Sequence, residues 1–121
     1  MTAKILIVED NELNMKLFYD ILEYQKYFVE KALDGLEAYE KITKNSYDLI
    51  ILDIQLPKLD GFSLLKKLKE ENIVLPPVII ASACAMDSDK VKAKEFGIVD
   101  YLTKPIDINN FVLTVKKKLS I

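Results

Sequence analysis

Three runs of branched apolar residues along the chain each end in a polar or acidic residue. The runs are continuous rather than alternating, which is typical of strands buried on both faces of a parallel sheet. Between them lie segments with the apolar spacing and the capping residues of helices. The runs span residues 5–8, 49–52 and 78–81, and the polar residues that follow them are Glu9, Asp10, Asp53 and Ser82.

Strand and helix signals alternate five times along the chain. This alternation predicts a doubly wound α/β domain, in which a five-stranded parallel sheet carries five helices on its two faces. Asn11, Asp34-Gly35 and Gly97 mark expected helix ends, because such residues cap helices or form turns. We expect strands at residues 4–8, 27–32, 48–53, 78–81 and 100–103, and helices at residues 12–25, 34–44, 62–71, 88–96 and 108–119.

Open parallel sheets bind ligands outside the carboxyl ends of their strands, near the point where the strand order reverses. Asp10, Asp53 and Ser82 should therefore converge on one edge, although they are far apart in the chain. Lys104 joins them, because it follows a fourth short apolar run and precedes a proline. The solvation of loops would explain one acid at a strand end. Four polar strand ends at one edge instead indicate a site for a metal ion and a phosphoryl group.

The carboxylates of Glu9, Asp10 and Asp53 would repel one another without a compensating cation. Mg²⁺ suits such a cluster, because it takes one or two carboxylates, keeps several waters and accepts a phosphate oxygen. Mn²⁺ is the expected substitute. We assign Asp10 and Asp53 as direct ligands, and Glu9 as a second or water-mediated ligand.

Asp53 is the expected phosphoacceptor, since a carboxylate can take up a phosphoryl group as an acyl phosphate. Phosphoryl transfer depends mostly on positioning and on neutralisation of charge. The metal ion would supply part of this neutralisation. Lys104 would supply a fixed positive charge, and the Ser82 hydroxyl one hydrogen bond to a phosphoryl oxygen.

The composition narrows the classes of function. The chain has no histidine, which removes Ser-His-Asp catalysis, histidine metal ligands and an internal phosphohistidine. Its net charge of −2 gives no reason to expect nucleic-acid binding, and no apolar stretch is long enough to insert into a membrane. The 121 residues fit one domain. The lone Cys84, most simply a small apolar filler, fits a reducing compartment, so we expect a cytoplasmic protein.

Four fragments carry a recognisable pattern: ILIVEDN (Ile5–Asn11), DLIILDIQLPKLDG (Asp48–Gly61), PVIIASA (Pro77–Ala83) and DYLTKP (Asp100–Pro105). In this order and spacing they resemble response-regulator receiver domains, which have a CheY-like, flavodoxin-like fold. The opening ILIVEDNELNMKLF and the later LDIQLP are similar to single-domain cell-division regulators of the DivK type. Glu9 and Ser82 stand where Asp and Thr are commoner, but each keeps the functional group.

The resemblance implies a stand-alone response regulator of a two-component system or phosphorelay, with one receiver domain (residues 1–121) and no output domain. It implies strand order 2-1-3-4-5. A sensor histidine kinase or a histidine phosphotransfer protein would phosphorylate Asp53 in the presence of Mg²⁺. The backbone carbonyl of Gln55 would be a further protein ligand of the ion, and the Lys104-Pro105 peptide bond would be cis.

The resemblance also implies a switch built on Ser82 and Tyr101. Phosphorylation would draw Ser82 inward and let the Tyr101 ring turn in; without the family match, Tyr101 would be a half-buried edge aromatic. The altered surface would bind a downstream protein, with a role in cell-cycle or cell-division control. This surface comprises the helix at residues 88–96, the strand at residues 100–103 and the last helix.

The first predicted helix, at residues 12–25, carries more apolar residues than one buried stripe accounts for. One face carries Leu13, Leu17, Ile21 and Tyr24. On the remaining surface, we expect that Met15, Phe18 and Leu22 help to dock a helical phosphoryl donor. The alternative is that the last helix covers this part of the first helix.

Two other functions remain open from the residues. A Mg²⁺-dependent phosphohydrolase with an aspartyl-phosphate intermediate would need a general acid for its leaving group, but Gln55 stands two residues after Asp53 where that acid would be. A flavin-binding doubly wound module would not explain the acids at the first and third strand ends. We therefore expect a phosphoacceptor switch and not an enzyme.

Overall fold

The computed structural model describes residues 2–83 and 86–120, and the predicted Cys84 filler lies outside them. All ten predicted elements are present within the described residues, with ends that differ from the prediction by one residue at most. The strands are β1 (Lys4–Val8), β2 (Phe28–Ala32), β3 (Leu49–Leu52), β4 (Val78–Ser82) and β5 (Asp100–Thr103). The helices are α1 (Glu12–Tyr24), α2 (Gly35–Lys44), α3 (Gly61–Glu70), α4 (Asp87–Glu95) and α5 (Ile108–Leu119).

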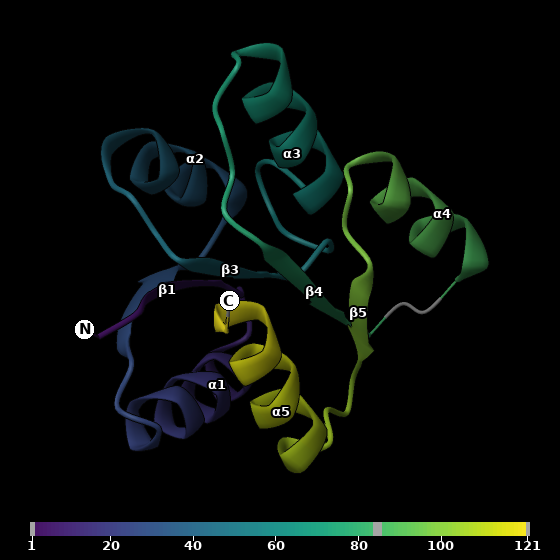
Figure 1. The fold of residues 1–121 in the computed structure, drawn as a ribbon. Helices are drawn as coiled ribbons and strands as arrows, with labels where there is room; N and C mark the ends of the chain where they lie inside the picture. The colour runs from purple at the N-terminus through teal and green to yellow at the C-terminus, as the bar shows by residue number, and fades with distance from the viewer. Residues whose placement is uncertain (1, 84–85, 121) are drawn as a thin grey trace.

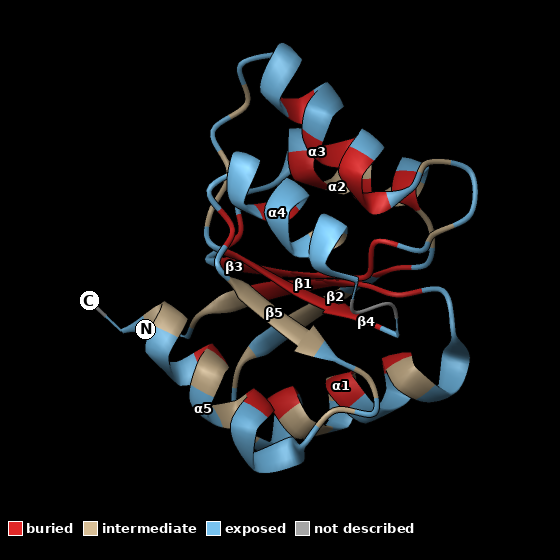
Figure 2. Ribbon diagram, turned by 90° about the vertical axis from the view of Figure 1, so that its right-hand side faces the viewer, coloured by how far each residue is buried: buried red, intermediate tan, exposed pale blue. Residues whose placement is uncertain are grey.

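The five strands form one parallel sheet in the order β2-β1-β3-β4-β5, which confirms the predicted order. Helices α1 and α5 cover one face, and α2, α3 and α4 cover the other (Figure 1). The strand order reverses between β1 and β3, since β2 lies on one side of β1 and β3 on the other. Figure 2 shows that β1, β3 and β4 are buried between the two helical layers, whereas β5 is a half-buried edge.

Two apolar cores hold the helices against the sheet. On the α1–α5 face, the rings of Phe18 and Phe111 lie 5.1 Å apart, so the two helices are joined through an aromatic pair. On the other face, the side chains of α2, α3 and α4 pack on alternate residues of the same strands. Continuous apolar runs are therefore needed, because each central strand contributes to both cores.

The outward face of α1 is the reverse of what the sequence suggested. Met15, Phe18 and Leu22 are buried, with Phe18 only 2% exposed, so the prediction that they dock a donor is wrong. Leu13, which is 80% exposed, lies on the solvent side. Both sets of residues have helical spacing, so periodicity could not predict which of them is buried. The set that includes Phe18 is buried because α5 packs over that side of α1.

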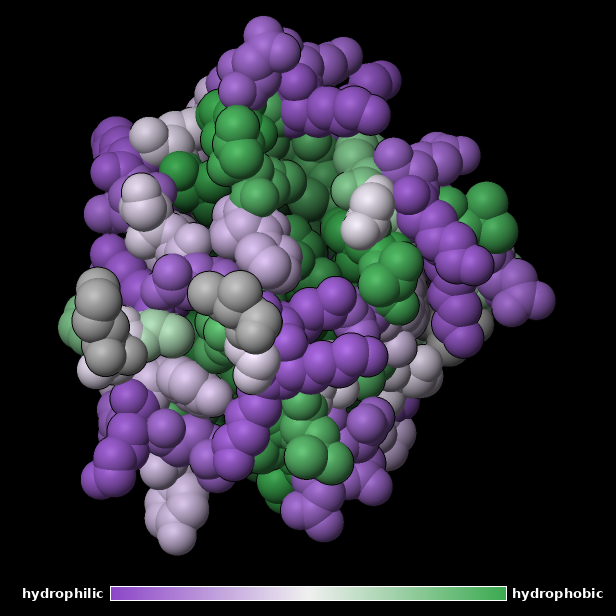
Figure 3. Space-filling model, viewed as in Figure 1, coloured by the Kyte–Doolittle hydropathy of each residue, from purple (hydrophilic) through white to green (hydrophobic). Residues whose placement is uncertain are grey.

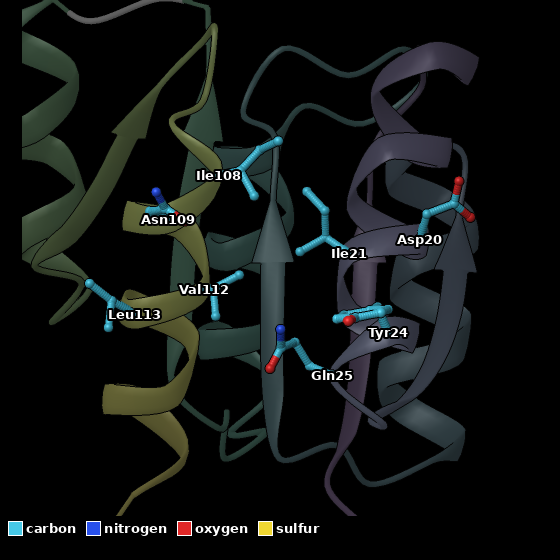
Figure 4. A pocket seen from close by; sticks show the side chains of 8 residues that line it. All are labelled: Asp20, Ile21, Tyr24, Gln25, Ile108, Asn109, Val112 and Leu113. Carbon is cyan, nitrogen blue, oxygen red and sulfur yellow. The ribbon is translucent and has the colours of Figure 1, made fainter.

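A shallow apolar groove of about 570 Å³ runs between α1 and α5. Figure 4 shows Ile21 on α1 and Val112 on α5 pointing toward each other across it, with Tyr24 and Leu113 farther along its sides. The outward apolar stripe of α1 is thus continuous with apolar side chains of α5.

Side-chain caps and close backbone approaches fix the loops around the carboxyl edge. Asn11 and Asp34 accept hydrogen bonds from the free amides of the first turns of α1 and α2. A Cβ atom on Gly35 would lie 1.7 Å from the Leu59 carbonyl oxygen, so only glycine lets α2 touch the loop that follows β3. The Lys104-Pro105 bond is cis, as predicted. Within the described residues, no helix is long and apolar enough to cross a bilayer.

Replacing Phe18 with alanine should lower the free energy of unfolding by about 3–5 kcal/mol, because it empties the centre of the α1–α5 core. The matched change Leu13→Ala on the same helix should alter it by no more than about 0.5 kcal/mol. Urea unfolding followed by circular dichroism measures both. Equal losses for the two variants would contradict the observed orientation of α1.

Candidate functional site

The predicted acids meet at the point where the strand order reverses. The Asp53 amide donates to the Val8 carbonyl oxygen at 3.0 Å, which sets the ends of β3 and β1 side by side. Glu9, Asp10 and Asp53 each offer a carboxylate oxygen, and these oxygens lie within 4.8 Å of one another. Glu9 and Asp53 are buried, at 1% and 5% exposure, whereas Asp10 faces solvent.

Lys104 supplies the positive charge of this cluster. Its ammonium donates a 2.9 Å hydrogen bond to Asp53 Oδ2 and pairs with Glu9 Oε1. Its backbone amide donates to the Ser82 carbonyl oxygen at 2.9 Å, so the loop after β5 is tied to the end of β4. Residues from four strand ends thus meet at one edge, as the sequence predicted. The Glu9–Lys104 pair was not predicted, because nothing local relates residues 95 positions apart.

The remaining carboxylate oxygens accept hydrogen bonds from backbone amides two residues onward. Asp53 Oδ1 accepts from the Gln55 N–H at 2.9 Å, and Glu9 Oε2 accepts from the Asn11 N–H at 3.0 Å. Sequence reasoning singled out the Gln55 carbonyl and missed its amide. The signal for the amide was available, since an acid at a strand end commonly binds its own backbone two residues on.

Burial and charge act in opposite directions on these groups. Burial raises the pKa of Glu9 above its ordinary value, although the hydrogen bond from Lys104 and the Asn11 amide oppose that rise. Burial alone would lower the pKa of Lys104, but its bonds to Glu9 and Asp53 outweigh this, and the pKa is raised. Lys104 is therefore a permanent cation at neutral pH.

Ser82 and Tyr101 lie on neighbouring strands at the same side of the sheet. Ser82 is fully buried at the end of β4, where it is paired with Thr103 of β5. Tyr101 is half-buried and packs against the core under α2, α3 and α4. The Lys90 ammonium of α4 lies 5.9 Å from the centre of the Tyr101 ring. The two predicted switch residues are therefore linked through adjacent strands, and Tyr101 borders α4.

The donor set fits a hard divalent cation. Mg²⁺ prefers carboxylate and carbonyl oxygens as ligands. Glu9, Asp10 and Asp53 each offer a carboxylate oxygen, and these oxygens lie within 4.8 Å of one another, so the three acids would hold such an ion and it would neutralise their charge. Exposed Asp10 leaves room for the waters that Mg²⁺ retains.

Residues 5–116 match the family described as the response regulator receiver domain. The chain belongs to this family. It is 42% identical over 120 residues to the polar-differentiation response regulator DivK of Brucella ovis, with 98% of each chain covered. The receiver resemblance and the CheY-like fold expected from the sequence are thereby confirmed.

Solved receiver structures have the same architecture. A two-component response regulator from Clostridium difficile superposes with a TM-score of 0.90 at 32% identity, covering 98% of this chain and 96% of that one. The receiver domain of a Pseudomonas aeruginosa sensor histidine kinase superposes with a TM-score of 0.84 at 28% identity, covering 98% of both chains. That structure contains a magnesium ion coordinated in its active-site cleft.

Replacing Lys104 with methionine should lower the free energy of unfolding of this receiver, without added metal, by about 3 kcal/mol. The reason is that two buried carboxylates lose their cation. Lys16→Met removes an exposed 2.8 Å pair with Asp20 and should leave the free energy of unfolding nearly unchanged, because solvent screens the pair. Urea unfolding at pH 7.5 with EDTA measures both. A Lys104 variant as stable as the Lys16 variant would show that the cluster needs no internal cation.

Proposed function

We propose that this receiver is a stand-alone response regulator and that Asp53 is its phosphoacceptor. A sensor histidine kinase or a histidine phosphotransfer protein would donate the phosphoryl group in the presence of Mg²⁺. The observation that carries the proposal is the buried Asp53 carboxylate, bonded to the Lys104 ammonium and grouped with Glu9 and Asp10. Because residues 1–121 contain no histidine, the phosphohistidine lies outside this receiver domain.

The transfer needs few groups. An Asp53 oxygen attacks the phosphorus, the P–N bond of the phosphohistidine breaks, and an acyl phosphate forms on Asp53 while the imidazole leaves. Lys104 stabilises the phosphoryl oxygens by charge, and the Ser82 hydroxyl donates one hydrogen bond. Asp10, Asp53, Glu9 and the Gln55 carbonyl would hold Mg²⁺, which supplies the remaining charge neutralisation when bound.

The donor would dock on the outward stripe of α1. This helix begins two residues after Asp10, so its first turns border the phosphoacceptor edge. Leu13 and Leu17 of these turns are exposed, at 80% and 41%. An exposed leucine pair one helical turn apart suits a helix of the donor, because residues four apart lie on one face.

The output surface is proposed to be α4, β5 and α5, as the resemblance implies. Helix α4 is weakly anchored: Ala93 is its one buried residue, and Met86 at its N-cap makes no side-chain capping bond. A helix with so few fixed contacts can shift at low cost when Ser82 and Tyr101 move. The similarity to DivK supports a role in cell-cycle or cell-division control, and we place the protein in the cytoplasm.

Incubation with acetyl phosphate should label wild-type protein at one site and leave Asp53→Asn unlabelled. Omitting Mg²⁺ should slow labelling at least about 100-fold, since charge stabilisation by a metal ion amounts to several kcal/mol in the transition state. Intact-protein mass spectrometry measures the added phosphate. Labelling that persists in Asp53→Asn would refute the assignment of the acceptor.

The fate of the phosphate on wild-type protein distinguishes a switch from a phosphohydrolase. A switch should lose its one phosphate per molecule slowly after acetyl phosphate is removed. Repeated turnover of an added phosphomonoester would instead favour the enzyme, which would need a general acid two residues after Asp53, where Gln55 stands.

Leu17→Glu should cut phosphotransfer from a phosphorylated histidine phosphotransfer domain by about tenfold or more, because it puts a charge in the docking stripe. Labelling of the same variant by acetyl phosphate should be unchanged, since that small donor needs no docking. Radioactive phosphotransfer with purified donor measures the first rate. An unchanged rate of transfer from the protein donor would show that α1 is not part of the docking surface.

Val74→Glu is the matched control. Val74, 93% exposed, lies in the loop between α3 and β4, at the end of the sheet opposite Asp53. It borders an apolar hollow of about 500 Å³ between α3 and α4, and Figure 3 shows hydrophobic residues gathered on this side of the molecule. A charge there should leave both phosphorylation rates unchanged.

A further inference from the structure

A hollow with a largely apolar lining lies between the C-terminal ends of α3 and α4. It has a volume of about 500 Å³, and its apolar lining residues are Leu65, Ile73, Val74, Leu75 and Phe96. Figure 3 shows hydrophobic residues gathered on this side of the molecule. The ring of Phe96, which follows α4, stacks on Phe62 of α3 with ring centres 6.3 Å apart. The two helices are therefore held together at the hollow.

Val74 on the rim of this hollow is 93% exposed. It belongs to a loop, residues 72–77, that carries no charged residue. A branched apolar side chain in water beside an apolar hollow is unfavourable, and an apolar patch with polar residues around it marks an interaction surface. The valine and the hollow would both leave water if the same surface of another molecule covered them.

Two opposite charges line the hollow from its two sides. Lys69 lies in the last turn of α3, and Glu95 is the last residue of α4. Within the part of the chain that the structure describes, neither residue forms an ion pair. The Lys69 ammonium lies 5.8 Å from the centre of the Phe96 ring, so its charge is at the hollow itself. The rim therefore offers one positive and one negative group for a partner.

The directions of the helices decide which partner fits these charges. Both helices follow parallel strands and lie on the same face of the sheet, so they run in the same direction (Figure 1). A two-fold axis along the hollow places the end of α3 against the end of α4 in a second copy. Lys69 of each copy then faces Glu95 of the other.

We propose that this α3–α4 surface binds a second copy of the chain about that two-fold axis. Each Val74 enters the hollow of the other copy, and each Lys69 pairs with Glu95 of the other copy. The contact closes at two molecules, because each copy contributes the same surface. The opposite charges fix the register of the two copies, and the apolar centre supplies the affinity.

One hollow and its rim form a small contact, so the dimer is weak. Interfaces that bury less than about 1,200 Å² in total belong to transient complexes. The contact uses the flank of α4 that faces α3, and it leaves free the flank where Lys90 lies 5.9 Å from the centre of the Tyr101 ring. It also lies at the end of the sheet opposite Asp53, so association should leave the labelling of Asp53 by acetyl phosphate unchanged.

Sedimentation velocity from about 10 µM to about 1 mM protein measures the association, because weak protein complexes dissociate in this range. Lys69→Glu and Glu95→Lys should each weaken it about tenfold or more, since like charges then meet twice in every dimer. Lys116→Glu is the matched control. Lys116 is an exposed lysine in the last turn of α5, on the other face of the sheet, and its reversal should leave association unchanged. Circular dichroism establishes that each variant is folded.

An equimolar mixture of the two single variants tests the symmetry of the contact. The Lys69→Glu chain is acidic at both rim positions, and the Glu95→Lys chain is basic at both. A mixed dimer therefore regains two opposite-charge contacts, whereas each variant alone has two repulsive ones. The mixture should recover the wild-type dissociation constant to within about threefold, which is the usual context dependence of such pairs.

Each outcome bears on the proposal. Wild-type protein that stays monomeric up to the highest concentration overturns it. A dimer that resists both rim reversals, or that Lys116→Glu weakens equally, forms elsewhere and also overturns it. Single variants that remain monomeric when mixed refute the pairing of α3 with α4. Loss of association in each variant and its recovery in the mixture support the proposal.

Discussion

The ion pairs of Lys104 are the interaction on which the carboxyl edge of the sheet depends. Glu9 and Asp53 are buried beside each other, with exposed Asp10 nearby. Two buried carboxylates without a cation would cost several kcal/mol or take up protons. Lys104, delivered from the loop after β5, makes the cluster compatible with a stable fold. The carboxylates that Lys104 neutralises in the resting protein, and Lys104 itself, are the groups that would interact with a metal ion and a phosphoryl group.

The topology of the parallel sheet brings these charges together. The carboxyl ends of β1 and β3 lie at the same edge because the strands are parallel. The strand order reverses between them, so the helices that follow them, α1 and α3, lie on opposite faces of the sheet and leave a crevice at this edge. Two contacts hold the loop after Asp53. The Gln55 amide of this loop donates a hydrogen bond to the Asp53 carboxylate. The backbone of α2 at Gly35 approaches Leu59 of the loop so closely that a side chain at Gly35 would collide with it. The carboxylate of Asp53, the proposed acceptor, is therefore held in place, as phosphoryl transfer by positioning requires.

The flanking helices contribute unequally. Helix α1 is fastened to the core through Phe18 and still exposes leucines beside the acidic edge, whereas α4 buries only Ala93. A firm helix next to the acceptor suits recognition of a donor, and a loosely held helix beside Tyr101 suits a change of surface after phosphorylation. Input and output can thus occupy different sides of one small domain.

The sequence by itself determined the ten elements and the strand ends that carry Glu9, Asp10, Asp53 and Ser82, because apolar runs and caps are local properties. It did not determine which stripe of α1 faces inward, since two stripes had helical spacing and only packing against α5 distinguishes them. Nor did it reveal that Lys104 pairs with Glu9. That contact was decided by the tertiary structure, because it depends on the reach of the two side chains once distant strand ends have met.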